Sequence, residues 1–402
     1  MNVLTSATRG CAALAAATLL PLAGCISSSE PTSSGWYTEA VAVADLDGDG
    51  SPDVLSATTV YDTVYQPGYL TVRRQSGTSP GTFDDPLRTT TCLDPEALAL
   101  GDVDGDGRLD VAVACGATTG TTFEVALHRQ ISSQPITFGP PTLLSTGTAQ
   151  PTAVRLADLD GDGQLDLVVG ARTGTGLLVF FQAPPPAPAG TFTAPVTLAV
   201  GSPAVAVTAA DLTGAGRLDL VAVTADGRAV VLLHDTAPGT FLPGVSYPAG
   251  IRPVAVEVAD LDGDGHPDLL MTDARGALLV MTQRAGGAAF DPVTAHDAFD
   301  QPTVALSVAD LDGDGRLDVA AASAGPPGLP GSVAVFLQAP VPDPPGTLLP
   351  PTLYTGSWGP LSVVAADVDG DGLPDLTIAD GLVSIRFQDP SGLFLPPITL
   401  RQ

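Results

Sequence analysis

Short segments in which apolar residues alternate with small or polar ones recur seven times along the 402-residue chain. The first is "EAVAVA" at Glu39–Ala44, in which Val41 and Val43 stand at alternate positions. A period of two places alternate side chains on one face, which is typical of a β-strand. A turn rich in aspartate and glycine follows each segment, and a second apolar run follows the turn, such as "DLVVGA" at Asp166–Ala171.

Two further strands are predicted in each repeat. In the third repeat they correspond to "GLLVFFQ" at Gly176–Gln182 and to the end of "GTFTAPVTLAV" at Gly190–Val200. A four-stranded sheet cannot bury both of its faces alone, whereas seven such sheets stacked in a ring can. We therefore predict an all-β chain that folds as a seven-bladed β-propeller with four antiparallel strands per blade. The domain is expected over residues 36–402, with blades at 36–95, 96–150, 151–202, 203–250, 251–299, 300–357 and 358–402. The last run, "PITLRQ", completes the seventh blade, so no strand exchange between the termini is needed.

The turn between the first two strands of each repeat has the form D-x-D-G-D-G-x-x-D. Ca²⁺ is a hard cation that takes six to eight oxygen ligands, and the interleaved glycines permit the tight turn. The fourth copy, "DLTGAGRLD", has Thr213 and Ala215 in place of two aspartates and keeps Asp211 and Asp219. We therefore predict six calcium sites. Each would use four aspartates and the backbone carbonyl of the seventh residue of the motif. The expected ligands are Asp45, Asp47, Asp49, Ser51 and Asp53; Asp102, Asp104, Asp106, Arg108 and Asp110; Asp158, Asp160, Asp162, Gln164 and Asp166; Asp260, Asp262, Asp264, His266 and Asp268; Asp310, Asp312, Asp314, Arg316 and Asp318; and Asp367, Asp369, Asp371, Leu373 and Asp375.

Helical calcium loops fit this pattern poorly, because an EF-hand needs a glutamate at position 12 and a helix on each side. Position 12 here is Ser56 in the first copy, and the flanks are strand-like. Magnesium is also disfavoured, because it keeps more water and takes fewer protein ligands.

The alternating strand, aspartate loop and second apolar strand together resemble the FG-GAP/VCBS repeats of integrin alpha-chain propellers and of many bacterial surface proteins. The resemblance extends over essentially the whole chain after its N-terminal segment. It implies that each loop joins the first two strands of a blade and binds calcium through its aspartates. A structural role for the ion is expected.

Charge restricts the partners. The formal net charge is −28, and 26 of the 44 acidic residues lie within the seven turn motifs. The 16 basic residues are all arginine. Because no basic stripe is present to meet phosphate groups, we do not expect a nucleic-acid partner. We expect a monomer.

The N-terminus predicts export. An apolar run at Cys11–Leu22 is too short to span a bilayer and ends in "LAGC", Leu22–Cys25. This resembles a bacterial lipobox, which implies a signal peptide at 1–24, lipidation of Cys25 and a tether at 25–35. The expected location is the outer membrane or cell surface. The alternative is an ordinary cleaved signal, since Arg9 is the only charged residue before the run. Export also favours a disulfide between Cys92 and Cys115 over two buried thiols.

No catalytic constellation is evident, and we do not expect an enzyme. The four histidines, His128, His234, His266 and His296, are spread over different repeats and are expected at the surface. A polysaccharide lyase on a calcium-bearing propeller is the alternative, but such chemistry needs a base and cations beside the developing charge.

Binding is the favoured function, on the face opposite the calcium loops. The expected partner is a glycan or a protein. Exposed aromatic rings suit sugar stacking or protein anchoring. Packing of the seam between the first and last blades is the alternative role for these rings. Arg155 and Glu257, on the first strands of their repeats, are candidates for the channel lining or for a mutual pair. The candidate aromatic residues are Trp36, Tyr37, Tyr61, Tyr65, Tyr69 and Trp358.

Overall fold

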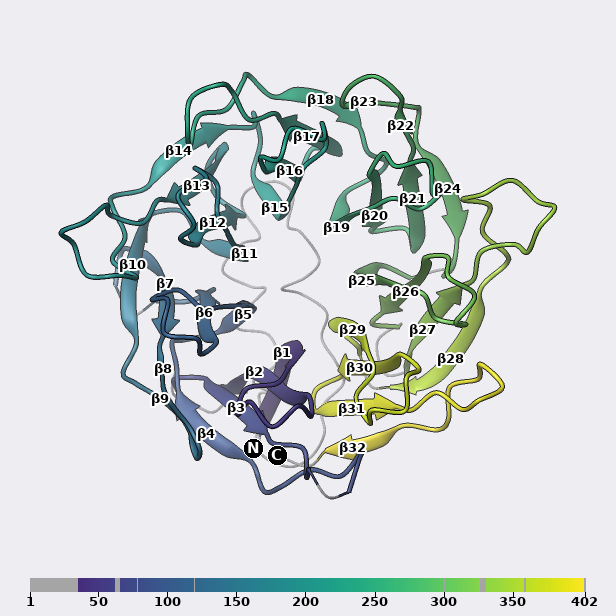
Figure 1. Cartoon of the computed structure of the whole chain (residues 1–402), viewed down its shortest axis with the longest axis horizontal. Coiled ribbons are helices and arrows are strands. Elements are labelled where there is room, and N and C mark those ends of the chain that lie inside the picture. The colour runs from purple at the N-terminus through teal and green to yellow at the C-terminus, as the bar shows by residue number, and fades with distance from the viewer. Residues whose placement is uncertain are drawn as a thin grey trace, which may run out of the picture.

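The computed structural model describes residues 35–61, 66–77, 79–118, 120–299, 301–325, 330–357 and 359–400. Seven four-stranded sheets stand around a central axis, which confirms the predicted seven-bladed propeller (Figure 1). Every neighbouring pair of strands within a blade is antiparallel, as in the pairing of the first two strands of the first blade. Within these ranges there is no helix of the length and apolarity that a membrane span requires.

Each blade is one continuous segment whose strands run in order from the axis outward, so the terminal blades do not share a sheet. Two short hairpins, β8–β9 and β22–β23, lie outside the blades, after the third strands of the second and fifth blades. The strands of the first four blades are β1 (Gly35–Ala44), β2 (Asp53–Tyr61), β3 (Tyr69–Arg73), β4 (Leu87–Thr90); β5 (Pro95–Gly101), β6 (Asp110–Cys115), β7 (Phe123–His128), β8 (Gln130–Ser133), β9 (Ile136–Phe138), β10 (Thr142–Gly147); β11 (Pro151–Ala157), β12 (Asp166–Ala171), β13 (Gly176–Phe180), β14 (Val196–Ala199); β15 (Ala204–Ala210), β16 (Asp219–Thr224), β17 (Arg228–Leu232) and β18 (Val245–Pro248). Those of the last three are β19 (Pro253–Ala259), β20 (Asp268–Asp273), β21 (Ala277–Met281), β22 (Gln283–Arg284), β23 (Ala289–Phe290), β24 (Thr294–Asp297); β25 (Thr303–Ala309), β26 (Asp318–Ser323), β27 (Gly331–Phe336), β28 (Thr352–Ser357); β29 (Ser362–Ala366), β30 (Asp375–Ala379), β31 (Val383–Arg386) and β32 (Ile398–Leu400).

The hydrophobic core is divided among the contacts between blades. Between the second and third blades, for example, Val125 and Leu127 pack with Leu167 and Val169. Val168, the residue between these last two, belongs instead to the cluster shared with the fourth blade. Alternate residues of one strand thus serve opposite contacts, which is why the second strands are apolar at nearly every position.

The ring closes through packing of the first blade on the seventh. Val41 and Val54 join Val383 and Ile385 in one buried cluster. The backbone amide of Thr38 also donates to the carbonyl of Gly381 at 3.2 Å. Burial of apolar surface therefore takes the place of a shared sheet at this contact.

Most inner strands carry a β-bulge close to their beginning. In β5 the register shifts between Pro95 and Ala97, which leaves Glu96 out of the regular ladder. In β1 the shift between Thr38 and Ala40 does the same for Glu39. Because a bulge re-aims the side chain it carries, these positions can present a group toward the axis.

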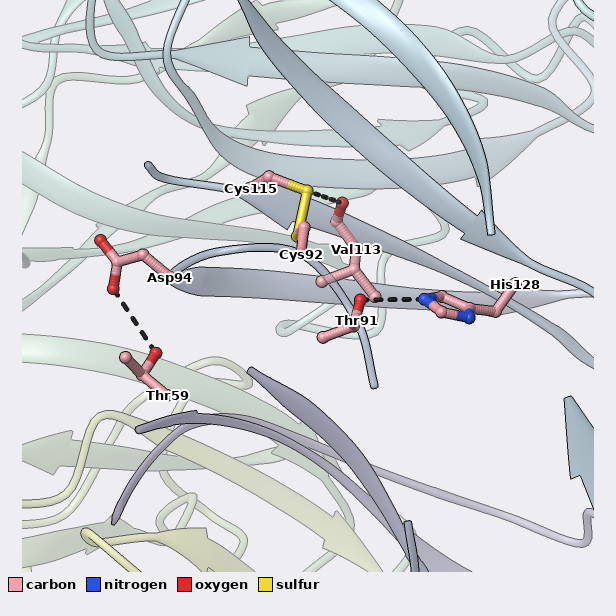
Figure 2. Close-up of a disulfide and its surroundings, with 7 residues drawn as sticks. All are labelled: Thr59, Thr91, Cys92, Asp94, Val113, Cys115 and His128. Atoms are coloured by element: carbon pink, nitrogen blue, oxygen red, sulfur yellow. Dashed lines mark hydrogen bonds between the residues drawn. A yellow bond between two sulfur atoms is a disulfide. The ribbon is translucent and has the colours of Figure 1, made fainter. Parts of the chain in front are cut away.

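A disulfide joins Cys92, in the link between the first two blades, to Cys115 at the end of β6 (Figure 2). Beside it the Thr91 hydroxyl lies 2.9 Å from His128 Nε2. His128 is fully buried, and burial lowers its pKa to about 4. The expectation that the histidines lie at the surface is thus wrong for His128, and also for His234, which is 9% exposed.

Candidate functional site

The aspartate loops join the inner strand of each blade to its second strand, as between β1 and β2. The residue after the first aspartate points into the core. Leu46 is 3% exposed, and Leu311 and Val368 are fully buried. This explains why that variable motif position is leucine or valine in all seven copies, and it anchors the otherwise exposed loop to the blade.

The fourth aspartate of each loop is a structural acceptor. Asp53 is 1% exposed. Its Oδ2 accepts from the amide of Leu46 at 2.9 Å, and its Oδ1 accepts from the amide of Gln75 at 2.8 Å. The same pair of bonds recurs in the degenerate fourth loop, where Asp219 accepts from Leu212 and His234. Sequence reasoning assigned this position to calcium alone and missed its part in the fold. The other members with the same two bonds are Asp110, Asp166, Asp268, Asp318 and Asp375.

The first aspartate organises the turn. Oδ1 of Asp45 accepts from the amide of Gly48 at 2.7 Å, and Oδ2 accepts from the amide of Gly50 at 2.9 Å. These glycines have φ of 76° and 88°. An added Cβ would meet nothing within 4 Å at either position. Glycine is therefore required by the left-handed backbone conformation and not by steric crowding from neighbouring atoms.

Three carboxylates converge in the intact loops. In the first loop, ligand oxygens of Asp45, Asp47 and Asp53 all lie within 4.8 Å of one another. Such an all-oxygen set suits a hard divalent cation. The third aspartate of the motif is not part of this cluster in the first loop or in its four equivalents. The roles of the third aspartate and of the backbone carbonyl as calcium ligands therefore stay predictions. The equivalent clusters are Asp102, Asp104, Asp110; Asp158, Asp160, Asp166; Asp260, Asp262, Asp268; and Asp310, Asp312, Asp318.

Burial raises the pKa of Asp53 to about 6, although its two backbone hydrogen bonds act in the opposite direction and Asp47 and Asp45 add repulsion. Asp318 has a pKa of about 6 for the same reasons, with repulsion from Asp312 and Asp314. A bound cation would favour the ionised form at these positions. The loops therefore have both the oxygen ligands and the charge that a divalent cation would complement.

A side chain from the following blade holds each of six loops. The Gln338 amide group donates 2.6 Å bonds to the carbonyls of Leu261, in the preceding blade, and of Leu317. In the fourth blade His234 takes this place, with Nε2 at 2.9 Å from the carbonyl of Leu159. Each loop is thus tied to its own sheet by the fourth aspartate and to the next blade by this residue. The other residues that reach back are Gln130, Gln182, Gln283 and Gln388.

A cavity of about 180 Å³ lies at the end of the inner strands remote from the loops. Glu39, Glu96, Arg172 and Arg252 line it, together with apolar residues such as Leu361. Glu39 and Glu96 each stand six residues before the first aspartate of their repeat, which places them about 20 Å along the strand from the loop. We refer to this cavity as the channel mouth.

The channel mouth brings together charges from several blades. Arg172, which follows β12, forms an ion pair with Glu96 of β5. Burial raises the pKa of Glu96 to about 7; Arg172 opposes this shift and Asp94 adds to it. Burial also raises the pKa of Glu39 well above its ordinary value, and Asp94 and Glu96 raise it further. Sequence reasoning missed this group, although a glutamate where the other repeats have valine, leucine or threonine was a signal for it.

Further along the inner strands, Arg155 Nη2 lies 3.4 Å from Glu257 Oε1. The two residues belong to β11 and β19, in the third and fifth blades, so the ion pair connects blades that are not neighbours (Figure 1). Of the two roles considered for these residues, this contact supports the mutual pair.

Several predicted site residues lie outside the described part of the chain. These are Cys25, Tyr65 and Trp358, and the side chains of Trp36 and Tyr61 also lie outside it. Tyr37 and Tyr69 are partly buried. The aromatic ligand site therefore stays a prediction.

The pattern of the FG-GAP-like repeat matches residues 45–113, 211–271, 260–321 and 310–378, more than half of the chain. That of the FG-GAP repeat matches residues 151–181. A comparison with curated protein sequences gives no match. Among solved structures the chain is similar to the Pseudomonas aeruginosa periplasmic gluconolactonase, with a TM-score of 0.57 and 18% sequence identity, over 91% of this chain and 95% of that one. At this identity the likeness shows the fold alone.

Proposed function

Because the chain belongs to the FG-GAP-like repeat family, we propose that it is a calcium-stabilised binding module that acts outside the cytoplasm. The observation that carries the proposal is the convergence of three carboxylates in the loops, such as Asp310, Asp312 and Asp318. Calcium matches this set because it accepts many oxygen ligands in flexible geometry. Six ions are expected, since Thr213 and Ala215 leave the fourth loop with two carboxylates.

The ions would serve stability in the first place. Six of the loops are tied both to their own sheet and to the next blade, so an ion that fixes such a loop would also support the contact between blades. Extracellular modules bind calcium with a Kd of about 10⁻⁴–10⁻³ M. The remote face, with its blade links and the predicted aromatic residues, is then left for a glycan or protein partner. Lipidation at Cys25 would hold the protein at the outer membrane or cell surface.

Two measurements test this proposal. Calorimetric titration of the metal-free chain with calcium should show about six bound ions. EDTA should lower the melting temperature of the calcium-loaded chain. Equal melting temperatures with EDTA and with excess calcium would refute the stabilising role. A glycan array, read with and without calcium, tests the binding role. Calcium-dependent retention of a glycan class would support it, and a blank array under both conditions would argue against the glycan form of the proposal.

A further inference from the structure

We propose that the channel mouth binds a small organic cation, a primary amine or a guanidinium, with the carboxyl group of Glu39 as its main partner. This inference deepens the binding role proposed above and rests on it. It concerns a different part of the molecule from the calcium loops and from the predicted aromatic residues.

The first support is the placement of the two glutamates. The position six residues before the first aspartate lines this cavity in several blades, and apolar residues such as Val254, Val304 and Leu361 occupy it there. Glu39 and Glu96 are the two acidic exceptions, and they lie on neighbouring blades. A bulge places each of them outside the regular ladder of its inner strand. The acidic groups therefore share the cavity with apolar residues and with Thr152, Arg172 and Arg252.

The second support is the carboxyl group of Glu39, which has no partner of its own in the described part of the chain although Arg172 and Arg252 also line the mouth. Glu96 is paired with Arg172, and the two side chains are 16% and 15% exposed. Among the residues that the structure describes, no hydrogen bond or ion pair reaches the carboxyl group of Glu39. Glu39 is partly buried, and a carboxylate that has lost part of its water is stabilised by a charged partner. The neighbouring Asp94 and Glu96 raise the pKa of Glu39 further, whereas Arg172 acts in the opposite direction. A bound cation would relieve the burial and the remaining repulsion.

The third support is strained backbone at the same place. Asp94 and Arg252 have φ of 52° and 56°, and they are the two non-glycine residues with left-handed backbone in the described ranges. Each stands eight residues before the first aspartate of its repeat, where the seventh blade has Gly359 with φ of 62°. Glycine would meet the turn's requirement without strain. Non-glycine residues held in this backbone conformation occur preferentially at functional sites.

The size and the field of the mouth favour an organic cation. A cavity of about 180 Å³ has room for about six water molecules at ~30 Å³ each, which is more than a bare ion needs. The walls of Val254 and Leu361 suit methylene groups, while a carboxylate suits an ammonium or guanidinium group. The net charge of −28 also raises the local concentration of cations around the chain.

The test is calorimetric titration of the calcium-loaded chain with putrescine and agmatine, with glucose and gluconate as neutral and anionic comparisons. Saturable binding of a cation, tighter at pH 8.5 than at pH 5.5, is expected, because the carboxyl group must be ionised. The variant E39Q keeps the shape and removes the charge, so it should weaken binding at least about tenfold. The variant E124Q, at a partly buried glutamate of β7 away from the cavity, is the matched control and should bind as the wild type does.

Urea unfolding of both variants shows whether each is folded, and E39Q is expected to be no less stable than the wild type. Equal binding of putrescine to the wild type and E39Q would overturn the inference, as would glucose binding as tightly as the cations or no binding at all. Retention of a glycan on the array without cation binding would overturn this inference alone. Cation binding with a blank array would uphold it and count against the glycan form of the proposed function.

Discussion

Removal of a fourth aspartate from an intact loop and from the degenerate loop separates its structural part from its metal-binding part. Asp318 accepts from the amides of Leu311 and Gln338, at 2.8 Å each, and also belongs to a carboxylate cluster. Asp219 makes the equivalent two bonds, at 2.9 and 2.7 Å, in the loop that lacks two aspartates. The variants D318A and D219A are therefore matched in hydrogen bonding and differ in metal binding.

Both variants leave two buried amides without an acceptor. At about 1–3 kcal/mol for each unsatisfied group, either should lower the free energy of unfolding by roughly 2–6 kcal/mol in EDTA. Calcium adds a second effect to D318A alone. With ~2 mM calcium and a Kd of ~0.1 mM, one site contributes about 1.8 kcal/mol. Six independent sites would contribute on the order of 10 kcal/mol to the wild type.

The quantity to compare is the gain in the free energy of unfolding between EDTA and 2 mM calcium, measured by urea unfolding and followed by circular dichroism. D219A should keep the wild-type gain. D318A should lose about 1.8 kcal/mol of it, and calorimetry should show one ion fewer. A full wild-type gain in D318A, or an equal loss in both variants, would refute the division of roles between the two loops.

Three further predictions concern other parts of the ring. The variant Q338L removes the bond to the carbonyl of Leu261 in the preceding blade and should cost about 1–3 kcal/mol in urea unfolding; an unchanged midpoint would contradict a stabilising contact between blades. Replacement of Cys92 and Cys115 by serine opens a link with a sequence separation of 23 and should cost about 3 kcal/mol, whereas no change in the unfolding midpoint would refute this. Because the pKa of Glu96 is about 7 in the folded chain against an ordinary 4.5, the folded state holds a proton that the unfolded state releases. Stability should therefore fall by up to about 3 kcal/mol as the pH rises from about 4.5 to 7 and then level off; an E96Q variant with the same pH profile as the wild type would disprove this source.

Local patterns in the sequence were sufficient for the architecture. The alternation that ends at Ala44, the glycines with positive φ and the seven spaced motifs each depend on residues close together in the chain. Strand periodicity and turn geometry are short-range properties, so the blade count, the strands of each blade and the place of each loop could be predicted. The candidate metal ligands could be found for the same reason, because all of them lie within nine consecutive residues.

The tertiary structure alone decided which residues far apart in the chain contact one another. Asp53 receives the amide of Gln75, 22 residues away, and Gln338 reaches a carbonyl 77 residues back. The channel mouth brings Glu39 and Glu96 together with Arg172 of a third blade. No local pattern encodes such distances, since they depend on how the closed ring brings separate segments to one axis. The sequence by itself therefore determined the ring and its loops, whereas packing around the axis decided which charges are paired and which carboxyl group is left without a partner.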